Sequence, residues 1–326
     1  MDYKDKRNDI IEVGKELLNT GLVARTWGNI SAREDDDNFL ITPSGLDYMT
    51  MQDSDIVEVN ITSGEWKGNH KPSGERGVHK AAYQVFKDVN FVVHTHQNYA
   101  TALGLAGFGT LDITEEENKK LGGIATAQYG LPGSDKLTNA VKEALESGAH
   151  IVLMLHHGIL ICGKDRDDAM ERTKLLEEVC ERSIKGKVED TNAKADNSTV
   201  LAKLKEKYEY VAIVSTKELI AVAGRKKDIV SQLDDVSQMV GAKVKSVGID
   251  GVEKALSKSN AILVDGLGAI VRADNDDDVE ALSVLMQKMA IVKLHTEAFN
   301  KKATIGFIDS IYMHHHYVTK YSKQKK

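Results

Sequence analysis

The sequence contains few cysteines and no long apolar stretch. Only Cys162 and Cys180 occur among its 326 residues, and two thiols cannot form the disulfide framework of a small secreted protein. Residues 1–9 are mostly charged and lack the apolar core of a signal peptide. No apolar run reaches the roughly 18 residues that a membrane-spanning helix needs. These absences predict a cytoplasmic protein that does not associate with membranes.

An excess of positive charge is also missing. The formal net charge is −6 and the pI is about 6.0, which argues against binding to the phosphate backbone of nucleic acid. The basic run at 320–326 is interpreted as a solvated terminus. With 41% hydrophobic and 28% charged residues, the composition is that of a globular protein. A chain of this length favours two domains.

Periodic patterns predict alternating helices and strands. The predicted helices cover 8–19, 77–86, 135–147 and 167–185, and the predicted strands cover 39–42, 56–61, 91–96 and a pair within 150–162.

A polar stretch at 185–198 predicts a domain boundary, with domains at 1–190 and 199–326. The second domain contains an echo of the first, because SKSNAILVDGLGAIVRADNDDD at 257–278 follows the pattern of SGAHIVLMLHHGILICGKDRDD at 147–168. Gly268 matches Gly158, but Leu267 matches His157. The second domain is therefore interpreted as a smaller, degenerate copy that kept the fold and lost the ligand. Chance similarity of two strand–turn–helix units remains the alternative.

His94 and His96 are the first candidate metal ligands. Residues i and i+2 of a strand project from the same face, so both imidazoles can reach one ion. Histidine suits a borderline cation such as zinc. Taken alone, such a pair more often lies unliganded on a solvated strand face.

A second candidate is the pair His156-His157, between the apolar run 151–155 and Gly158. An imidazole buried there needs a metal or a hydrogen-bond partner, because unpartnered burial costs about 1–3 kcal/mol. Adjacent strand residues point to opposite faces, so only one of the two should be a ligand. Their spacing does not decide which one.

Glu75 lies at the predicted start of the helix at 77–86, where a carboxylate is commonly a cap. The same helix start offers free N–H groups around Ser73 and Gly74, which favour an anion such as phosphate. The loops at 28–31 and 42–45 have the same glycine and serine character. Together, the three loops predict a phosphate pocket beside a metal.

The ordered motifs GNIS at 28–31, TPSG at 42–45, KPSGE at 71–75, HTH at 94–96 and HHG at 156–158 resemble those of the class II aldolase/adducin family. The resemblance covers roughly residues 8–185. It implies a three-layer α/β/α fold with a largely antiparallel central sheet.

The resemblance also implies the roles of individual residues. It assigns a metal, Zn²⁺ or another divalent ion, to His94, His96 and His157, and leaves His156 a structural role. It makes Glu75 the catalytic acid/base. The phosphate-binding positions that it implies are Gly28, Asn29, Ser44, Gly45, Ser73 and Gly74.

The implied activity is that of a zinc-dependent lyase, a class II aldolase that cleaves a small phosphorylated ketose by a retro-aldol reaction through a metal-bound enediolate. The alternatives are a sugar-phosphate dehydratase or epimerase that uses the same metal, and a catalytically silent, adducin-like scaffold. The partners expected are a phosphorylated sugar and further copies of the chain, in a dimer or tetramer.

The chain departs from the aldolase pattern after the HTH strand, where 112–117 reads DITEEE without the family's tyrosine. This acidic cluster is interpreted as a solvated helix start. Tyr312, Tyr317 and Tyr321 are candidates to replace a second family tyrosine that comes from a neighbouring subunit. The adjacent histidines at 314–316 are interpreted as a surface feature.

Overall fold

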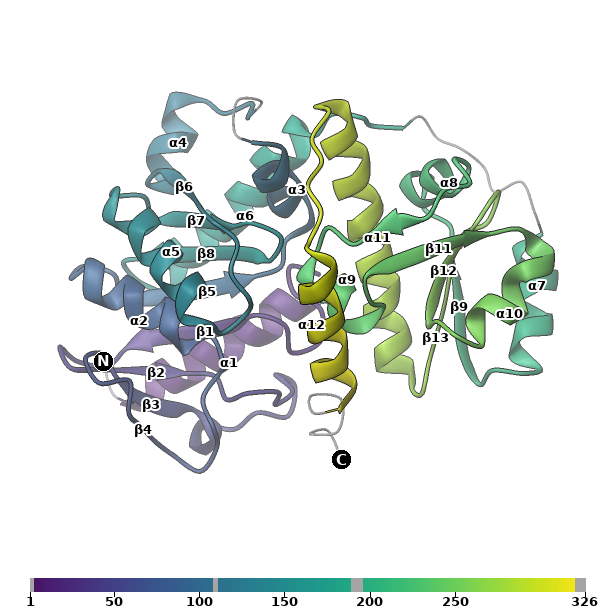
Figure 1. Ribbon diagram of the computed structural model, residues 1–326. Coiled ribbons are helices and arrows are strands. Elements are labelled where there is room, and N and C mark those ends of the chain that lie inside the picture. Colours follow the sequence, from purple (N-terminus) through teal and green to yellow (C-terminus); the bar gives the residue numbers. More distant parts are fainter. Residues whose placement is uncertain (1–2, 108–110, 189–195, 320–326) are drawn as a thin grey trace. The chain divides into compact units, whose positions relative to one another are not determined.

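The computed structural model describes residues 3–107, 111–188 and 196–319, and the chain divides into two compact units, 1–183 and 184–326 (Figure 1). They are called the N-terminal and C-terminal units below. The basic run at 320–326 and Tyr321 lie outside the described residues.

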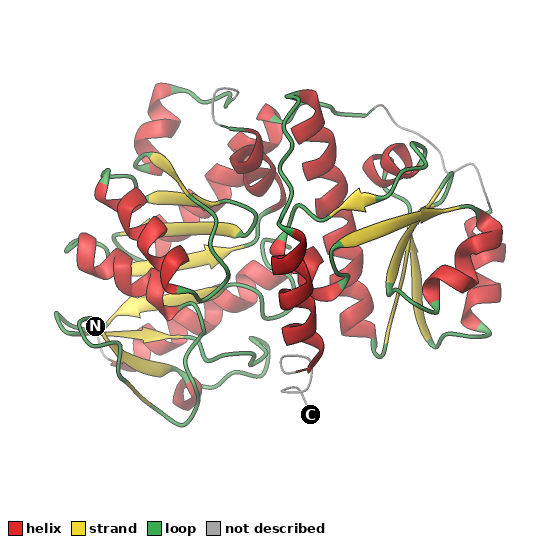
Figure 2. Cartoon of the chain, in the orientation of Figure 1, coloured by secondary structure: helices red, strands yellow, loops and turns green. Residues whose placement is uncertain are grey.

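The N-terminal unit alternates helices with strands (Figure 2). Its helices are α1 (Tyr3–Asn19), η1 (Asp53–Asp55), α2 (Arg76–Val85), α3 (Asn98–Ala106), α4 (Glu115–Leu121), α5 (Asp135–Glu146) and α6 (Arg166–Ser183). Its strands are β1 (Asn29–Arg33), β2 (Asn38–Ile41), β3 (Val57–Asn60), β4 (Trp66–Lys67), β5 (Phe91–Thr95), β6 (Ile124–Ala127), β7 (Ile151–Met154) and β8 (Gly158–Gly163).

These strands form one eight-stranded sheet in the order β4-β3-β2-β1-β5-β8-β7-β6. All neighbours run antiparallel except β6 and β7. Helices α2 and α5 pack on one face and α1 and α6 on the other, each with its own buried apolar cluster. Because both faces are covered, β1, β5, β7 and β8 are buried along their whole length. The three-layer α/β/α prediction with a largely antiparallel sheet is confirmed.

The predicted elements of the N-terminal unit are present, with ends shifted by a few residues. The sequence patterns did not reveal β1, η1, α3 and β6, which are all nine residues or shorter. Residues 28–31 were expected to form a loop, but Asn29–Ser31 belong to β1. The acidic cluster at 112–117 is a helix start, as predicted. Thr114 caps α4 and Glu117 pairs with Arg182, while Glu115 and Glu116 are exposed.

The C-terminal unit is also an α/β structure. Its helices are α7 (Asn197–Lys205), α8 (Lys217–Ala223), α9 (Asp234–Met239), η3 (Ile249–Gly251), α10 (Val252–Leu256), α11 (Asp276–Ala298) and α12 (Phe307–Thr319). Its strands are β9 (Tyr210–Val214), β10 (Ile229–Val230), β11 (Lys243–Val247), β12 (Ala261–Val264) and β13 (Gly268–Ala273), in the sheet order β10-β11-β12-β13-β9.

The C-terminal sheet repeats half of the N-terminal one. Strands β11 and β12 are parallel, like β6 and β7, and β12–β13–β9 are antiparallel, like β7–β8–β5. Even the register agrees, since Val264 pairs with Gly268 as Met154 pairs with Gly158. Counterparts of β1 to β4 are absent from the described part of this unit. The second domain is therefore a smaller, degenerate copy, which confirms that part of the fold prediction.

The two matching glycines are needed for the same close approach between strands. A Cβ atom on Gly158 would lie 2.3 Å from the Thr95 carbonyl oxygen, and one on Gly268 would lie 2.4 Å from the Val214 carbonyl oxygen. Gly268 also has a φ of +99°, which L side chains rarely adopt. Only glycine therefore allows the first residue of β8 or β13 to lie against the neighbouring strand.

We expect Gly268→Ala to destabilise the C-terminal unit by about 2–4 kcal/mol, because both the overlap and the backbone conformation penalise a Cβ atom. Hydrogen exchange would show it as faster exchange in β9, β12 and β13. Gly248→Ala is the matched control, since a Cβ atom there meets nothing within 4 Å. Equal effects of the two substitutions would contradict this explanation.

None of the described helices is long and apolar enough to cross a membrane. Cys162 and Cys180 are both buried, and neither is in a disulfide.

Candidate metal centre

The sheet register brings three histidines together. His94 lies in β5 and His96 just beyond its end, while His157 lies in the turn between β7 and β8. Because β5 pairs antiparallel with β8, with His94 opposite Leu160, the turn before β8 lies beside the end of β5. One ligand nitrogen from each of the three rings lies within 4.8 Å of the others. The ring centroids are 4.9 to 5.0 Å apart.

A backbone hydrogen bond fixes the tautomer of His94. Its ring is fully buried, and Nδ1 lies 2.8 Å from the carbonyl oxygen of Ile159. A carbonyl oxygen only accepts, so Nδ1 must carry the proton and donate. The Nε2 atom of the neutral ring is left with a lone pair that faces His96, whose Nε2 is 3.1 Å away. This is the arrangement of a histidine ligand whose other nitrogen is held by the protein.

Glu75 faces the same three rings. It occupies the residue before α2, but its side chain makes no capping hydrogen bond. Instead Oε1 lies 2.7 Å from His157 Nε2, and Oε2 lies 3.1 Å from His94 Nε2. Burial alone would raise the pKa of Glu75, but His157 and His94 in their protonated forms attract and hydrogen-bond its carboxylate, which outweighs burial and holds the pKa well below its usual value. The group is therefore an ionised carboxylate beside the rings.

The donor set fits a divalent cation. Two nitrogens that both lie about 2.0–2.1 Å from a tetrahedral zinc ion are roughly 3.3–3.4 Å apart. The 3.1 Å between His94 Nε2 and His96 Nε2 is close to that spacing. Three neutral imidazoles leave the ion its full charge, and the carboxylate of Glu75 lies where a fourth ligand would be. In the described part of the chain no other cluster of histidine, cysteine or acidic side chains has this geometry.

His156 lies outside this cluster. Its φ is +67°, in the left-handed region that residues other than glycine rarely adopt. Its ring meets Tyr129 edge-on, with 5.3 Å between the centroids. The structure thus places His157 with the other two rings, a choice that the sequence spacing left open.

The three glycine and serine segments lie next to one another, although the first is not a loop, because Asn29–Ser31 belong to strand β1. Ser44 N–H donates to Lys71 O and Ser73 N–H to Thr42 O, so the second and third loops form a short bridge. Gly28 packs so closely on the backbone of His94 that a Cβ atom would lie 2.7 Å from its carbonyl oxygen. Asn29 Nδ2 lies 3.1 Å from Glu75 Oε2, so the first residue of β1 lies beside the residue that follows the third segment.

One expectation about these loops is wrong. The N–H group of Ser73 is not free for an anion, because the pairing of the two loops uses it. The Gly74 N–H makes no hydrogen bond within the described residues, and a Cβ atom on Gly74 or Gly45 would meet open space. The side chains of Asn29, Ser44 and Ser73 and the N–H groups of Gly45 and Gly74 are therefore the donors that remain for an anion at the predicted phosphate positions.

A buried histidine beside this site was not predicted from the sequence. His79 lies one helical turn after Glu75 in α2 and is completely buried. Its pKa is lowered to about 3, mainly by burial and also by His94, while Glu75 acts in the opposite direction. The i, i+4 spacing of Glu75 and His79 was the available signal, since it places both on one helix face.

We expect His79 to make stability depend on pH. Its pKa is about 3 in the folded protein, against an unfolded value of 6.5, so the unfolded state binds the proton first as the pH falls. Between about pH 5.5 and 4, the wild type should lose about 1.4 kcal/mol of unfolding free energy per pH unit more than His79→Gln. Denaturant titrations at a series of pH values measure this difference. Parallel pH profiles would show that His79 is protonated in the folded state.

The corresponding place in the C-terminal unit has lost all three rings. By strand register, Ile213 of β9 and Ser215 after it stand where His94 and His96 stand, and Leu267 stands for His157. Ser215 Oγ donates to Leu267 O at 2.7 Å and accepts from Asn197 Nδ2 at 2.7 Å. In the C-terminal unit this place is thus occupied by the Ser215 hydroxyl, which is hydrogen-bonded to other protein groups, and by two apolar side chains.

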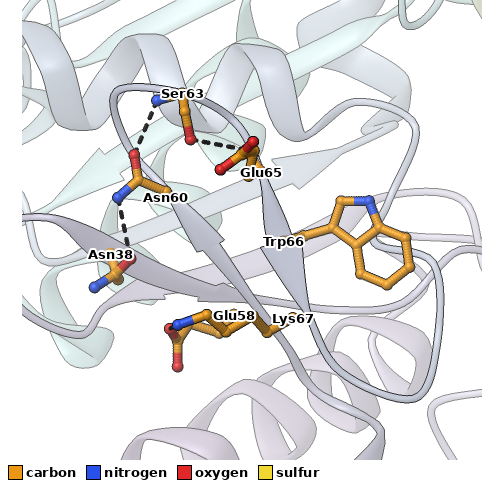
Figure 3. Close-up of a pocket in the computed structure, with 7 residues that line it drawn as sticks. All are labelled: Asn38, Glu58, Asn60, Ser63, Glu65, Trp66 and Lys67. Atoms are coloured by element: carbon orange, nitrogen blue, oxygen red, sulfur yellow. Dashed lines mark hydrogen bonds and ion pairs between the residues drawn. The ribbon is translucent and has the colours of Figure 1, made fainter.

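A surface hollow of about 600 Å³ lies elsewhere in the N-terminal unit, around the β3–β4 hairpin (Figure 3). Its lining residues are Asn38, Glu58, Asn60, Ser63, Glu65, Trp66 and Lys67. None of them belongs to the histidine cluster, and Asn60 and Ser63 are engaged in hydrogen bonds of the hairpin itself.

The fold and the site define a class of protein, a three-layer α/β structure with three histidines and a glutamate at the end of its central strands. The model of the Class II Aldolase and Adducin N-terminal domain matches residues 8–184. The chain belongs to the class II aldolase and adducin family. The match ends at the border of the N-terminal unit, so the degenerate copy lies beyond it.

Several related proteins match a little over half of the chain. L-ribulose-5-phosphate 4-epimerase UlaF from Salmonella paratyphi B is 30% identical over 186 residues, which are 53% of this chain and 81% of that protein. Among solved structures, an L-fuculose 1-phosphate aldolase is 29% identical with a TM-score of 0.52, covering 56% of this chain and 86% of its own. YgbL from Klebsiella pneumoniae is 28% identical with a TM-score of 0.51, covering 56% and 89%.

Proposed function

We propose that this protein is a zinc-dependent lyase, a class II aldolase that cleaves a small phosphorylated ketose. The observation that carries the proposal is the meeting of three imidazoles with the ionised carboxylate of Glu75. A scaffold has no physical need for such a set, because burying it without a ligand costs free energy. His94, His96 and His157 would hold the ion, which would act as a Lewis acid on substrate oxygens.

The side chains of this protein supply the remaining chemistry. In the cleavage direction a carbon–carbon bond breaks, an aldehyde leaves, and the electron pair stays with the fragment that contains the carbonyl group. Glu75, which is ionised, takes up the proton that the substrate hydroxyl loses as it becomes the aldehyde carbonyl, and delivers it to the carbon of that fragment. Both transfers reverse in the direction of synthesis. The N–H groups of Gly45 and Gly74 and the side chains of Asn29, Ser44 and Ser73 bind the phosphate group, and Gly28 lets the chain beside it lie against the backbone of His94.

A second candidate is epimerisation of a phosphorylated ketopentose, favoured by the epimerase relatives. Bond cleavage is common to both reactions. An epimerase keeps the aldehyde and rejoins it from the other face, so the product has the same carbon count. An aldolase releases it.

A panel of phosphorylated ketoses, assayed for free aldehyde and for isomers of unchanged carbon count, tests the proposal. We expect aldehyde release that disappears on chelation and returns with zinc. Isomer formation without aldehyde would favour the epimerase, and no turnover of any member by the zinc-loaded protein would overturn the proposed function.

We further propose that the active form is a homo-oligomer, a dimer or a tetramer. The repeated half-sheet of the C-terminal unit motivates this, because a chain with two related units can build in one dimer the surfaces that single-domain subunits build in a tetramer. Light scattering at assay concentration that gave a monomer mass would refute it.

A further inference from the structure

Four hydrogen bonds in series lead from the protein interior to Glu75. The hydroxyl of Tyr83 lies 2.7 Å from Ser31 Oγ, and Ser31 Oγ lies 2.6 Å from His79 Nδ1. His79 Nε2 lies 2.5 Å from Asn29 Oδ1, and Asn29 Nδ2 lies 3.1 Å from Glu75 Oε2. Tyr83, Ser31 and His79 are fully buried and Asn29 is 4% exposed, so water does not compete with these bonds.

The series has one consistent direction. The Asn29 Oδ1 atom only accepts, so His79 Nε2 must carry a proton and donate it. Burial keeps the ring neutral by lowering its pKa to about 3, which leaves Nδ1 as an acceptor for the Ser31 hydroxyl. Ser31 Oγ in turn accepts from the Tyr83 hydroxyl. Each donor therefore points towards Glu75, and the last is an N–H group of Asn29.

We propose that His79 is a positioning residue: its ring fixes the side-chain amide of Asn29 so that the N–H group, and not the oxygen, faces Glu75. The reversed amide would place Oδ1 against Glu75 Oε2, two acceptors without a proton between them. The amide thus holds Oε2 on the side of His94 and leaves Oε1 facing His157. The effect of this amide orientation on turnover rests on the proposed function. The orientation itself can be measured independently of any activity.

A residue that only filled the core would not need this arrangement. An apolar side chain would pack at the same place without the desolvation cost of about 1–3 kcal/mol that each buried polar group carries when unpaired. Glutamine can replace His79 in its two roles, because its amide has one acceptor and one donor group. Leucine has neither.

The test uses the full-length protein with His79→Gln, His79→Leu and the control Thr173→Val. Thr173 is equally buried in the same unit, and its hydroxyl donates to the carbonyl of Ala169 and to no other described residue. In ¹⁵N-labelled protein, the side-chain amide of Asn29, assigned with Asn29→Ser, should show one proton shifted and protected by its bond to Glu75. We expect that signal in the wild type, Thr173→Val and His79→Gln, and its loss in His79→Leu. The His79 ring should appear as the neutral Nε2–H tautomer.

Kinetics provide the second readout. On a substrate identified from the ketose panel, His79→Leu should lower kcat roughly 10- to 100-fold with little change in KM, and His79→Gln should recover most of it. An unchanged Asn29 signal in a folded His79→Leu protein, or a proton on Nδ1 of the ring, would overturn the proposal. If the amide responds as expected while the wild type turns over no ketose phosphate, the positioning role stands and the proposed function fails.

Discussion

Replacement of His157 by alanine is expected to abolish stoichiometric metal binding and to lower turnover by about 1000-fold or more. The loss has two causes. Two imidazoles remain where a catalytic zinc site uses three protein ligands, and the Lewis acid that the ion supplies contributes several kcal/mol of transition-state stabilisation, at about 1.4 kcal/mol for each factor of ten. Metal content per chain and kcat/KM on the same preparation measure both effects.

His156→Asn is the matched control for this substitution. His156 is adjacent in sequence but lies against Tyr129 rather than in the cluster, and asparagine tolerates its left-handed φ of +67°. Normal metal content and turnover in His156→Asn, with both lost in His157→Ala, is the expected pattern. Equal losses in the two variants would show that the turn, and not the ligand, is needed.

Replacement of Glu75 by glutamine is expected to keep the metal and lose the chemistry. Glutamine has the same shape and can still accept from Asn29 Nδ2, but it cannot exchange a proton, so kcat should fall by about 10²- to 10⁴-fold. Exchange of the substrate's carbon-bound hydrogen with solvent deuterium, followed by NMR, reports this step without requiring the full reaction.

A metal titration of Glu75→Gln separates the role of Glu75 from that of the histidines. We expect one ion per chain, as in the wild type, because His94, His96 and His157 are retained. Loss of the metal would make Glu75 an essential ligand, and exchange at the wild-type rate would remove it from the reaction.

The pairing of His94 with His96 was predictable from the sequence because it depends on local geometry. Alternation along one strand places His94 and His96 on the same face. The choice between His156 and His157 could not be predicted from their spacing, because it depends on the conformation of the turn before β8, where His156 adopts a positive φ. The loop pairing that uses the Ser73 N–H joins segments distant in sequence, and no local pattern reveals it.

In the degenerate copy, too, some residue correspondences with the N-terminal unit could be predicted from the sequence and others required the strand pairing. The match of Gly158 with Gly268 followed from a repeat at constant spacing, and the strand register confirms it. The counterparts of His94 and His96 could not be found from the repeat spacing, because the segment between β9 and β12 differs in length from the segment between β5 and β7. Only the pairing of β9 with β13 identifies Ile213 and Ser215 as the replacements.

The buried polar groups behind the site are also beyond a sequence pattern. Ser31, His79 and Tyr83 lie on a central strand and a helix where apolar residues are the norm. Their partners become visible only when β1 and α2 are packed together.

X-ray absorption at the zinc edge of the full-length protein measures whether His94, His96 and His157 hold the ion. We expect one zinc ion per chain with three imidazole nitrogens at about 2.0–2.1 Å, and a changed spectrum in His157→Ala. A protein that binds no ion when zinc is supplied in excess would show that these histidines are not a metal site. A zinc spectrum that is the same in His157→Ala would show that His157 is not a ligand.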